Sequence, residues 1–170
     1  ADTVREASKY VKVAAVEVEV SMFTQDNLDN GVAQACAELN IPVTAYSPMG
    51  RGILTGSIKS TKDAEYLGFV GSFPRFQEEA MAHNLKLVDR VHEMAREKGC
   101  SSAQLALAWV RSISKRPGMP VIIPIPGATK PGRVQENSRP VELSDAELKR
   151  LDRILEGFSI AGTRYPQGIP

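Results

Sequence analysis

Residues 43–56 have the sequence VTAYSPMGRGILTG, which is a short apolar strand followed by a glycine-rich loop. Residues 120–137, PVIIPIPGATKPGRVQEN, show the same order, because an apolar run again leads into a loop of glycine and proline. Two stretches with helical periodicity separate these segments. Strands that alternate with helices are typical of a parallel α/β sheet. The sequence therefore predicts an α/β fold, either a small isolated sheet or a piece of a larger barrel.

Three strands are expected, over residues 13–20, 43–46 and 120–125, with a short fourth near 139–143. The run at 120–125 is apolar throughout and predicts a buried strand. In residues 13–20, valines alternate with Glu17 and Glu19. This alternation also fits a half-exposed antiparallel strand on which both glutamates are solvated, so it leaves the role of the two carboxylates open.

Helices are expected over residues 2–10, 29–40 and 78–98, the last of them closed by Gly99. Capping-box patterns at 101–104 and 144–147 predict the starts of two more, the first of them buried around Trp109. A short helix is expected near 131–137. Residues 47–78 are poorly patterned, and such long loops are functional or mobile; a disordered insertion at 57–75 is the alternative. The whole chain, 1–170, is expected to be a single partial domain that ends in an irregular tail arm at 157–170.

Composition excludes several classes of protein. The chain has 170 residues, of which 42% are hydrophobic and 24% charged, and its net charge is +1. These values predict a soluble domain with no nucleic-acid partner and no membrane partner. Cys36 and Cys100 are too few for a disulfide framework, which favours a reduced, cytoplasmic location. His83 and His92 lie nine positions apart on one expected helix, so no metal site is predicted.

Both loops that follow strands carry residues suited to a ligand. In the first, glycines allow close backbone approach, Tyr46 offers an aromatic face and Arg51 a charge. In the second, a helix that begins at a proline places Thr129, Lys130 and Arg133 around its N-terminus. A helix start with two cations favours a phosphate group. The alternative is a basic helix start whose side chains are simply solvated.

Several segments resemble one known family. AYSPMGRGILTG at 45–56 is similar to the segment after the sixth strand of aldo-keto reductases, and IPIPGATKPGRVQEN at 123–137 to the segment after their seventh. VAAVEVEVSMF at 13–23 resembles their fifth strand, and SSAQLALAWV at 101–110 the helix before the seventh. VEVEVSMF and PRFQEEAMAHNLKLVDRV look most like the fungal pyridoxal reductase branch.

This resemblance implies an NADP-linked oxidoreductase fold, of which the chain matches only the C-terminal half, strands five to eight of a (β/α)8 TIM barrel. It implies NADPH or NADP as cofactor and a small aldehyde or ketone, such as pyridoxal, as substrate. The family's Asp, Tyr, Lys and His tetrad lies on the first four strands, so no residue of this chain is expected to be catalytic. The chain alone is expected to be inactive, and to pair with a missing N-terminal half or to self-associate. The alternatives are a non-catalytic nucleotide-sensing or scaffold module, and a truncated product with no activity.

The resemblance also assigns roles to particular residues. Tyr46 matches the tyrosine that stacks on the nicotinamide. Glu17 stands where many members have a glutamine that contacts the carboxamide; a carboxylate accepts from the amide nitrogen but cannot donate to its oxygen. The preference for NADPH over NADH rests on Lys130 and Arg133. The predicted cofactor-binding set is Glu17, Tyr46, Ser47, Pro48, Met49, Gly50, Arg51, Leu54, Ile125, Gly127, Thr129, Lys130, Arg133, Glu136 and Asn137. Within this set, Ser47, Met49, Gly50 and Leu54 line the pyrophosphate and ribose, Gly127 and Thr129 belong to the phosphate clamp, and Glu136 and Asn137 hold the adenine.

Overall fold

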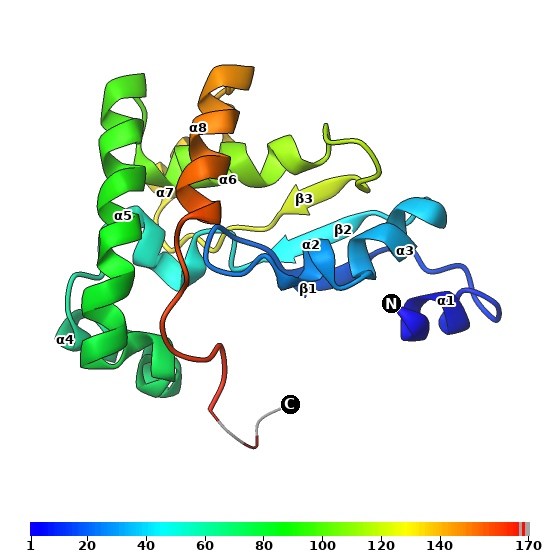
Figure 1. Ribbon diagram of the computed structural model, residues 1–170, viewed down its shortest axis with the longest axis horizontal. Coiled ribbons are helices and arrows are strands. Elements are labelled where there is room, and N and C mark those ends of the chain that lie inside the picture. Colours follow the sequence, from blue (N-terminus) through cyan, green and yellow to red (C-terminus); the bar gives the residue numbers. More distant parts are fainter. Residues whose placement is uncertain (167, 169–170) are drawn as a thin grey trace. The chain divides into compact units, whose positions relative to one another are not determined.

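The computed structural model describes residues 1–166 and 168 of the chain (Figure 1). The chain divides into two compact units. The first comprises Ala1–Arg51 and Gln104–Leu143, and the second Gly52–Ala103 and Ser144–Pro170. The single partial domain expected from the sequence stays a prediction.

The first unit contains a parallel sheet of three strands, in the order β1, β2, β3 (Figure 1). The strands are β1 (Val16–Glu19), β2 (Val43–Tyr46) and β3 (Ile122–Pro124). Val16 pairs with Val43, and Val43 with Ile122. All three predicted strands are confirmed, and the antiparallel alternative for the first is wrong. The predicted fourth strand is also wrong, because residues 139–143 form none; Pro140 there has no N–H to donate to a ladder.

The two faces of this sheet differ in burial. Val43, Ala45 and Ile122 are buried, whereas Ile123 is 47% exposed and Ile125, just past the strand, is 43% exposed. The prediction of a buried strand at 120–125 therefore holds for one face of the strand and is wrong for the other. Successive residues of a strand point to opposite faces, and an apolar run does not reveal that only one of them is covered.

The helices of the first unit are α1 (Asp2–Ala7), α2 (Asp26–Asp29), α3 (Val32–Glu38) and α7 (Pro131–Ser138), together with α6 (Ser102–Ile113), which begins two residues before the unit boundary. The helix expected over 29–40 is wrong in its first turn, because Gly31 has a left-handed φ of 91° and separates α2 from α3. Trp109 and Cys36 are fully buried, as expected for core residues. Burial raises the pKa of the Cys36 thiol, so this cysteine is chiefly a small apolar core group.

The second unit is mainly helical. After the turn η1 (Gly50–Thr55) come α4 (Thr61–Ala64), η2 (Glu65–Ser72), η3 (Pro74–Phe76), α5 (Glu78–Lys98) and α8 (Asp145–Glu156). The expected boundaries of α5 are confirmed, and Gly99 closes it in a left-handed conformation. Residues 57–75 fold into short helical turns rather than an unstructured insertion. None of the helices in the described part of the chain is long and apolar enough to cross a membrane.

An ion pair connects α5 and α8, which lie side by side in the second unit (Figure 1). The Nζ of Lys98 donates to both carboxylate oxygens of Glu147, at 2.8 and 2.9 Å. Glu147 also completes the capping box predicted at 144–147, since it accepts from the backbone N–H of Ser144 at 2.7 Å. Lys98, followed by this N–H group, lowers the pKa of the Glu147 carboxyl from its ordinary 4.5 to about 2.

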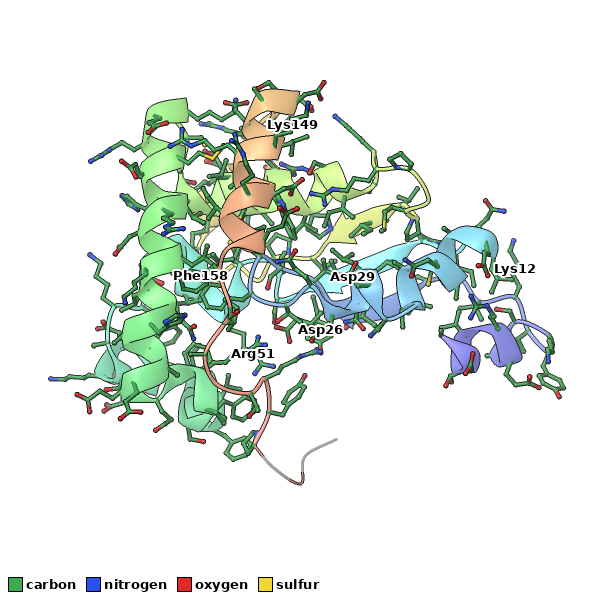
Figure 2. The ribbon with its side chains drawn as sticks, viewed as in Figure 1. Lys12, Asp26, Asp29, Arg51, Lys149 and Phe158 are labelled. Atoms are coloured by element: carbon green, nitrogen blue, oxygen red, sulfur yellow. The ribbon has the colours of Figure 1, made fainter. Side chains whose placement is uncertain are left out.

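A buried amide on α5 helps to hold the tail after α8. The Nδ2 of Asn84 donates to the carbonyls of Ala161, at 3.0 Å, and Arg75, at 3.3 Å, and its Oδ1 accepts from the N–H of Ala161 at 2.9 Å. Beside it, the ring of His83 lies 4.7 Å from that of Phe158 (labelled in Figure 2). The described part of the tail has no helix or strand. Residues 167, 169 and 170 of the predicted arm lie outside the described residues.

The depressed pKa of Glu147 predicts how stability depends on pH. Because the folded-state pKa lies below the unfolded value of 4.5, the pair contributes its full stability above pH 4.5 and loses it as the pH falls toward 2. The free energy of unfolding, measured with urea, should therefore fall more over this pH range in the wild type than in Glu147→Gln. Equal acid sensitivity of the two proteins would contradict this role of the pair.

Removal of the Asn84 side chain should release the tail. Asn84→Ala leaves the backbone groups of Ala161 without their buried partner, so the free energy of unfolding should fall by about 2–3 kcal/mol. Trypsin should also cut after Arg164 faster than in the wild type. Lys86→Ala, an exposed change on the same helix, is the control and should alter neither result. Unchanged cleavage after Arg164 in Asn84→Ala would show that other contacts hold the tail.

Candidate functional site

The three strands of the first unit end at one edge of the sheet (Figure 1). Glu19 is in register with Tyr46, and the N–H of Ile125 continues the ladder by donating to the carbonyl of Ala45 at 3.0 Å. The loops that follow the strands therefore begin side by side. In open parallel sheets this edge is where ligands bind. The residues that the sequence analysis assigned to the cofactor lie on these strands or in the segments that follow them, apart from Leu54, which belongs to the second unit and is fully buried.

The loop after β2 has an unusual backbone. Ser47 and Arg51 have positive φ angles of 48° and 59°, and Gly50 has one of 58°. The N–H of Gly50 donates to the carbonyl of Ser47 at 2.9 Å, which closes a tight turn over the buried Pro48. Positive φ is uncommon for residues other than glycine and costs about 1–3 kcal/mol. Such a conformation persists only where surrounding contacts enforce it.

A buried carboxylate lies beside this loop. Glu19, the last residue of β1, is only 2% exposed, and its Oε2 lies 3.6 Å from Nη2 of Arg51 (labelled in Figure 2). Its Oε1 accepts a hydrogen bond from Thr24 Oγ1 at 3.0 Å, and its backbone carbonyl accepts from Asn27 at 3.0 Å. Buried charges are costly unless they are paired. The pair therefore ties the end of β1 to the loop after β2.

The sequence analysis did not distinguish Glu19 from Glu17. The two point to the same face of the sheet, beside Tyr46 and Thr44 respectively, yet Glu17 is exposed whereas Glu19 is buried. Sequence reasoning placed Glu17 in the site and missed Glu19. The available signal was position: Glu19 ends its strand, and Arg51 is in the loop that follows the neighbouring strand. An acid and a base so placed are brought together once the two strands pair in parallel.

The loop after β3 presents exposed cations. Lys130 is the residue before α7, Pro131 occupies the first position of the helix, and Arg133 lies in its first turn. The N–H groups of Arg133 and Val134 already donate to the carbonyl of Lys130, at 3.0 and 3.3 Å. What the start of α7 offers to an anion is therefore chiefly the two side-chain charges and the helix dipole. Thr129 is exposed beside them.

The remaining predicted residues flank this helix start. Glu136 and Asn137 are partly exposed on α7, and Nε2 of Gln104 in α6 donates to the carbonyl of Glu136 at 3.4 Å. A Cβ built on Gly127 would meet nothing within 4 Å, so packing does not require a glycine there. The segment before α7 is thus open to close approach by a bulky ligand.

This arrangement suits an elongated anion. Tyr46 and the turn at 47–51 lie at the end of β2, and the cations lie beyond β3, its neighbour in the sheet.

In the described residues there is no group of three or more His, Cys, Asp or Glu that would hold a metal ion. The Nε2 of His83 donates to the carbonyl of Ser159 at 2.8 Å, and the Nδ1 of His92 lies 3.3 Å from Ser102 Oγ, both in the second unit. Both histidines are at the core edge or the surface, as expected.

Comparison with known sequences identifies relatives along almost the whole chain. The Aldo/keto reductase family matches residues 1–156. The chain is 38% identical to a putative pyridoxal reductase of Saccharomyces cerevisiae over 162 residues, which cover 90% of this chain and 47% of the relative. It is 36% identical to the aldo-keto reductase yakc [NADP(+)] of Schizosaccharomyces pombe over 172 residues, 99% of this chain and 49% of the relative. The chain thus spans about half the length of these relatives.

Solved structures show the same fold. A glycerol dehydrogenase of Gluconobacter oxydans superposes with a TM-score of 0.74 at 22% identity, over 99% of this chain and 50% of its own. A thermostable aldo-keto reductase in complex with the inhibitor epalrestat gives a TM-score of 0.59 at 21% identity, over 88% of this chain and 43% of its own. The three-stranded parallel sheet of this chain is consistent with part of the (β/α)8 barrel that the sequence resemblance implies.

Proposed function

The chain belongs to the aldo/keto reductase family, and from this premise we propose that it forms the NADPH-binding half of an enzyme that reduces a small aldehyde or ketone to an alcohol. Pyridoxal is the proposed substrate, since a yeast relative carries the name pyridoxal reductase. The observation that carries the proposal is the pair of exposed cations, Lys130 and Arg133, at the helix start beside the sheet edge. We further propose that the sheet belongs to strands five to eight of a (β/α)8 barrel. We also propose that the protein is located in the cytoplasm.

The residues at the sheet edge fit such a dinucleotide. Guanidinium and ammonium groups bind a phosphate through charge-assisted hydrogen bonds, which makes Lys130 and Arg133 suited to a 2′-phosphate. The turn at 47–51 and the open Gly127 allow close backbone approach to a pyrophosphate. The partly exposed ring of Tyr46 is suited to stack on a flat heterocycle.

When bound, NADPH would supply the hydride that reduces the carbonyl carbon. In this proposal the chain's own residues bind and orient the dinucleotide, and the group that protonates the carbonyl oxygen lies in the half of the relatives that this chain does not span. Catalytic residues act together as a set, so binding of the cofactor alone does not replace the function of a missing member. The 170-residue chain by itself should therefore bind NADPH without turning over an aldehyde.

A titration of the chain with NADPH or NADH, monitored by the fluorescence of the reduced dinucleotide, tests the binding. The wild type should bind NADPH more tightly than NADH, because only NADPH carries the 2′-phosphate. Loss of one charge-assisted hydrogen bond of about 1.5–3 kcal/mol should weaken NADPH binding about tenfold to a hundredfold in Lys130→Ala or Arg133→Ala, and NADH binding far less.

Arg139→Ala is the matched control, because it removes an exposed cation just after α7. It should leave both affinities unchanged. Equal affinity of the wild type for the two dinucleotides would contradict the proposed phosphate clamp. Saturable binding of neither would contradict the proposed function of the chain as it stands.

We also propose that the exposed face of the sheet is covered by a partner, either a complementary half or a second copy. Val121, Ile123 and Ile125 present an apolar row on one face, and in the described chain β1 and β3 are each paired on one side only. Outer strands with one unpaired side, next to exposed apolar side chains, favour association with another chain. Light scattering at micromolar concentration should show a dimer or larger species, and Ile123→Lys should weaken it. Tyr10→Lys, at an exposed site outside the sheet, should not, and a monomeric wild type would contradict self-association.

A further inference from the structure

We propose that Glu19 is the positioning residue of the dinucleotide site: its buried carboxylate fixes Arg51 and, through it, the left-handed turn after β2. The inference rests on the proposed function, because it assigns that turn to the pyrophosphate end of NADPH. It adds a residue that the resemblance did not assign. Glu19 itself touches neither cofactor nor substrate in this proposal and acts through Arg51.

Burial and geometry single out this pair. The chain has other glutamate–arginine pairs, such as Arg5 with Glu38 at 3.0 Å, but the Glu38 side chain is 60% exposed. The Glu19 side chain is 3% exposed and that of Arg51 18%. An exposed pair is screened by water and contributes little, whereas a buried carboxylate requires its partner to stay in place. The Glu19 carboxylate therefore constrains where the guanidinium of Arg51 lies.

The backbone of Arg51 is what needs this constraint. Its φ of 59° is unfavourable for a residue with a side chain, and a glycine stands on each side of it. The two flanking glycines make the segment easy to deform, so few local interactions fix the conformation of the turn. A guanidinium held in one position supplies such an interaction. Thr24 in turn orients the carboxylate through its hydroxyl group, 3.0 Å from Oε1.

The location of the pair predicts which part of a dinucleotide it serves. Arg51 follows β2, whereas Lys130 and Arg133 follow β3 and are assigned to the 2′-phosphate. NADPH and NADH have the same pyrophosphate and differ only in that phosphate. A defect in the turn should therefore weaken both dinucleotides by the same factor, which is a pattern that loss of the clamp cations does not produce.

Trypsin tests the positioning without any cofactor. In the wild type, cleavage of the bond between Arg51 and Gly52 should be slow, because the arginine side chain is held and largely buried. In Glu19→Gln the charge is lost but the shape is kept, and this cleavage should accelerate about tenfold relative to cleavage after the exposed Lys62. Glu38→Gln, which breaks the exposed pair, is the matched control and should leave the rate after Arg51 unchanged.

Dinucleotide titration of the same variants tests the link to function. Glu19→Gln should weaken NADPH and NADH by the same factor, about tenfold, with their ratio preserved. A fall in NADPH affinity alone would overturn the assignment to the pyrophosphate end. Unchanged cleavage after Arg51 would overturn the positioning role whether or not any dinucleotide binds. If the wild type binds neither dinucleotide, the proposed function fails, and the cleavage experiment still decides whether Glu19 fixes Arg51.

Thr24→Val keeps the proposal testable if Glu19→Gln does not fold, as judged by its thermal unfolding. The variant removes the hydroxyl that orients the carboxylate but keeps both charges of the pair. It should give a smaller acceleration of cleavage after Arg51, together with a smaller and equal loss of affinity for both dinucleotides. No acceleration in a folded Thr24→Val would overturn the proposed chain of contacts from Thr24 through Glu19 to Arg51.

Discussion

Parallel pairing of β1, β2 and β3 is the constraint on which the first unit depends. Because all three strands run in the same direction, the loops after them begin at one edge, and residues far apart in sequence become neighbours there. Glu19 and Tyr46 come into register only through this pairing. A slip of one residue would turn Glu19 to the opposite face of β1 and separate it from Arg51, because side chains alternate between faces.

The charges near this edge divide into two kinds. Glu19 and Arg51 are largely withdrawn from water and paired, so their effect is on the position of the chain. Lys130 and Arg133 are exposed, at a helix start whose dipole favours anions. A site that must hold a multiply charged ligand benefits from both kinds, since the first keeps the backbone in place and the second supplies the attraction. This division explains why an arginine in a glycine-rich loop need not act as an exposed phosphate ligand.

Much of the fold was predictable because local signals agreed with the tertiary structure. The periodicity of α5 and its terminal Gly99 predicted both ends of that helix, and the capping box at 144–147 predicted the start of α8. The break at Gly31 was not predictable, because an isolated glycine inside a helical pattern is often tolerated. Nor could periodicity separate Glu17 from Glu19: their burial differs through Thr24 and Arg51, which join the site only when the chain folds. The resemblance supplied the predicted cofactor residues, but it gave no reason to look at the last residue of β1.

The division into two units bears on how binding relates to the rest of the chain. Every predicted cofactor residue except Leu54 belongs to the first unit, whereas the buried Asn84 that holds the tail belongs to the second. Asn84 makes its hydrogen bonds with backbone groups of Ala161 and Arg75, so this part of the tail's attachment relies on the path of the chain and not on tail side chains. Gly162 reinforces this, because a Cβ there would lie 2.7 Å from the backbone of Pro74. A tail fixed in this way leaves no room for a side chain at Gly162, whereas the predicted cofactor residues of the first unit lie on the strands or in the segments that follow them.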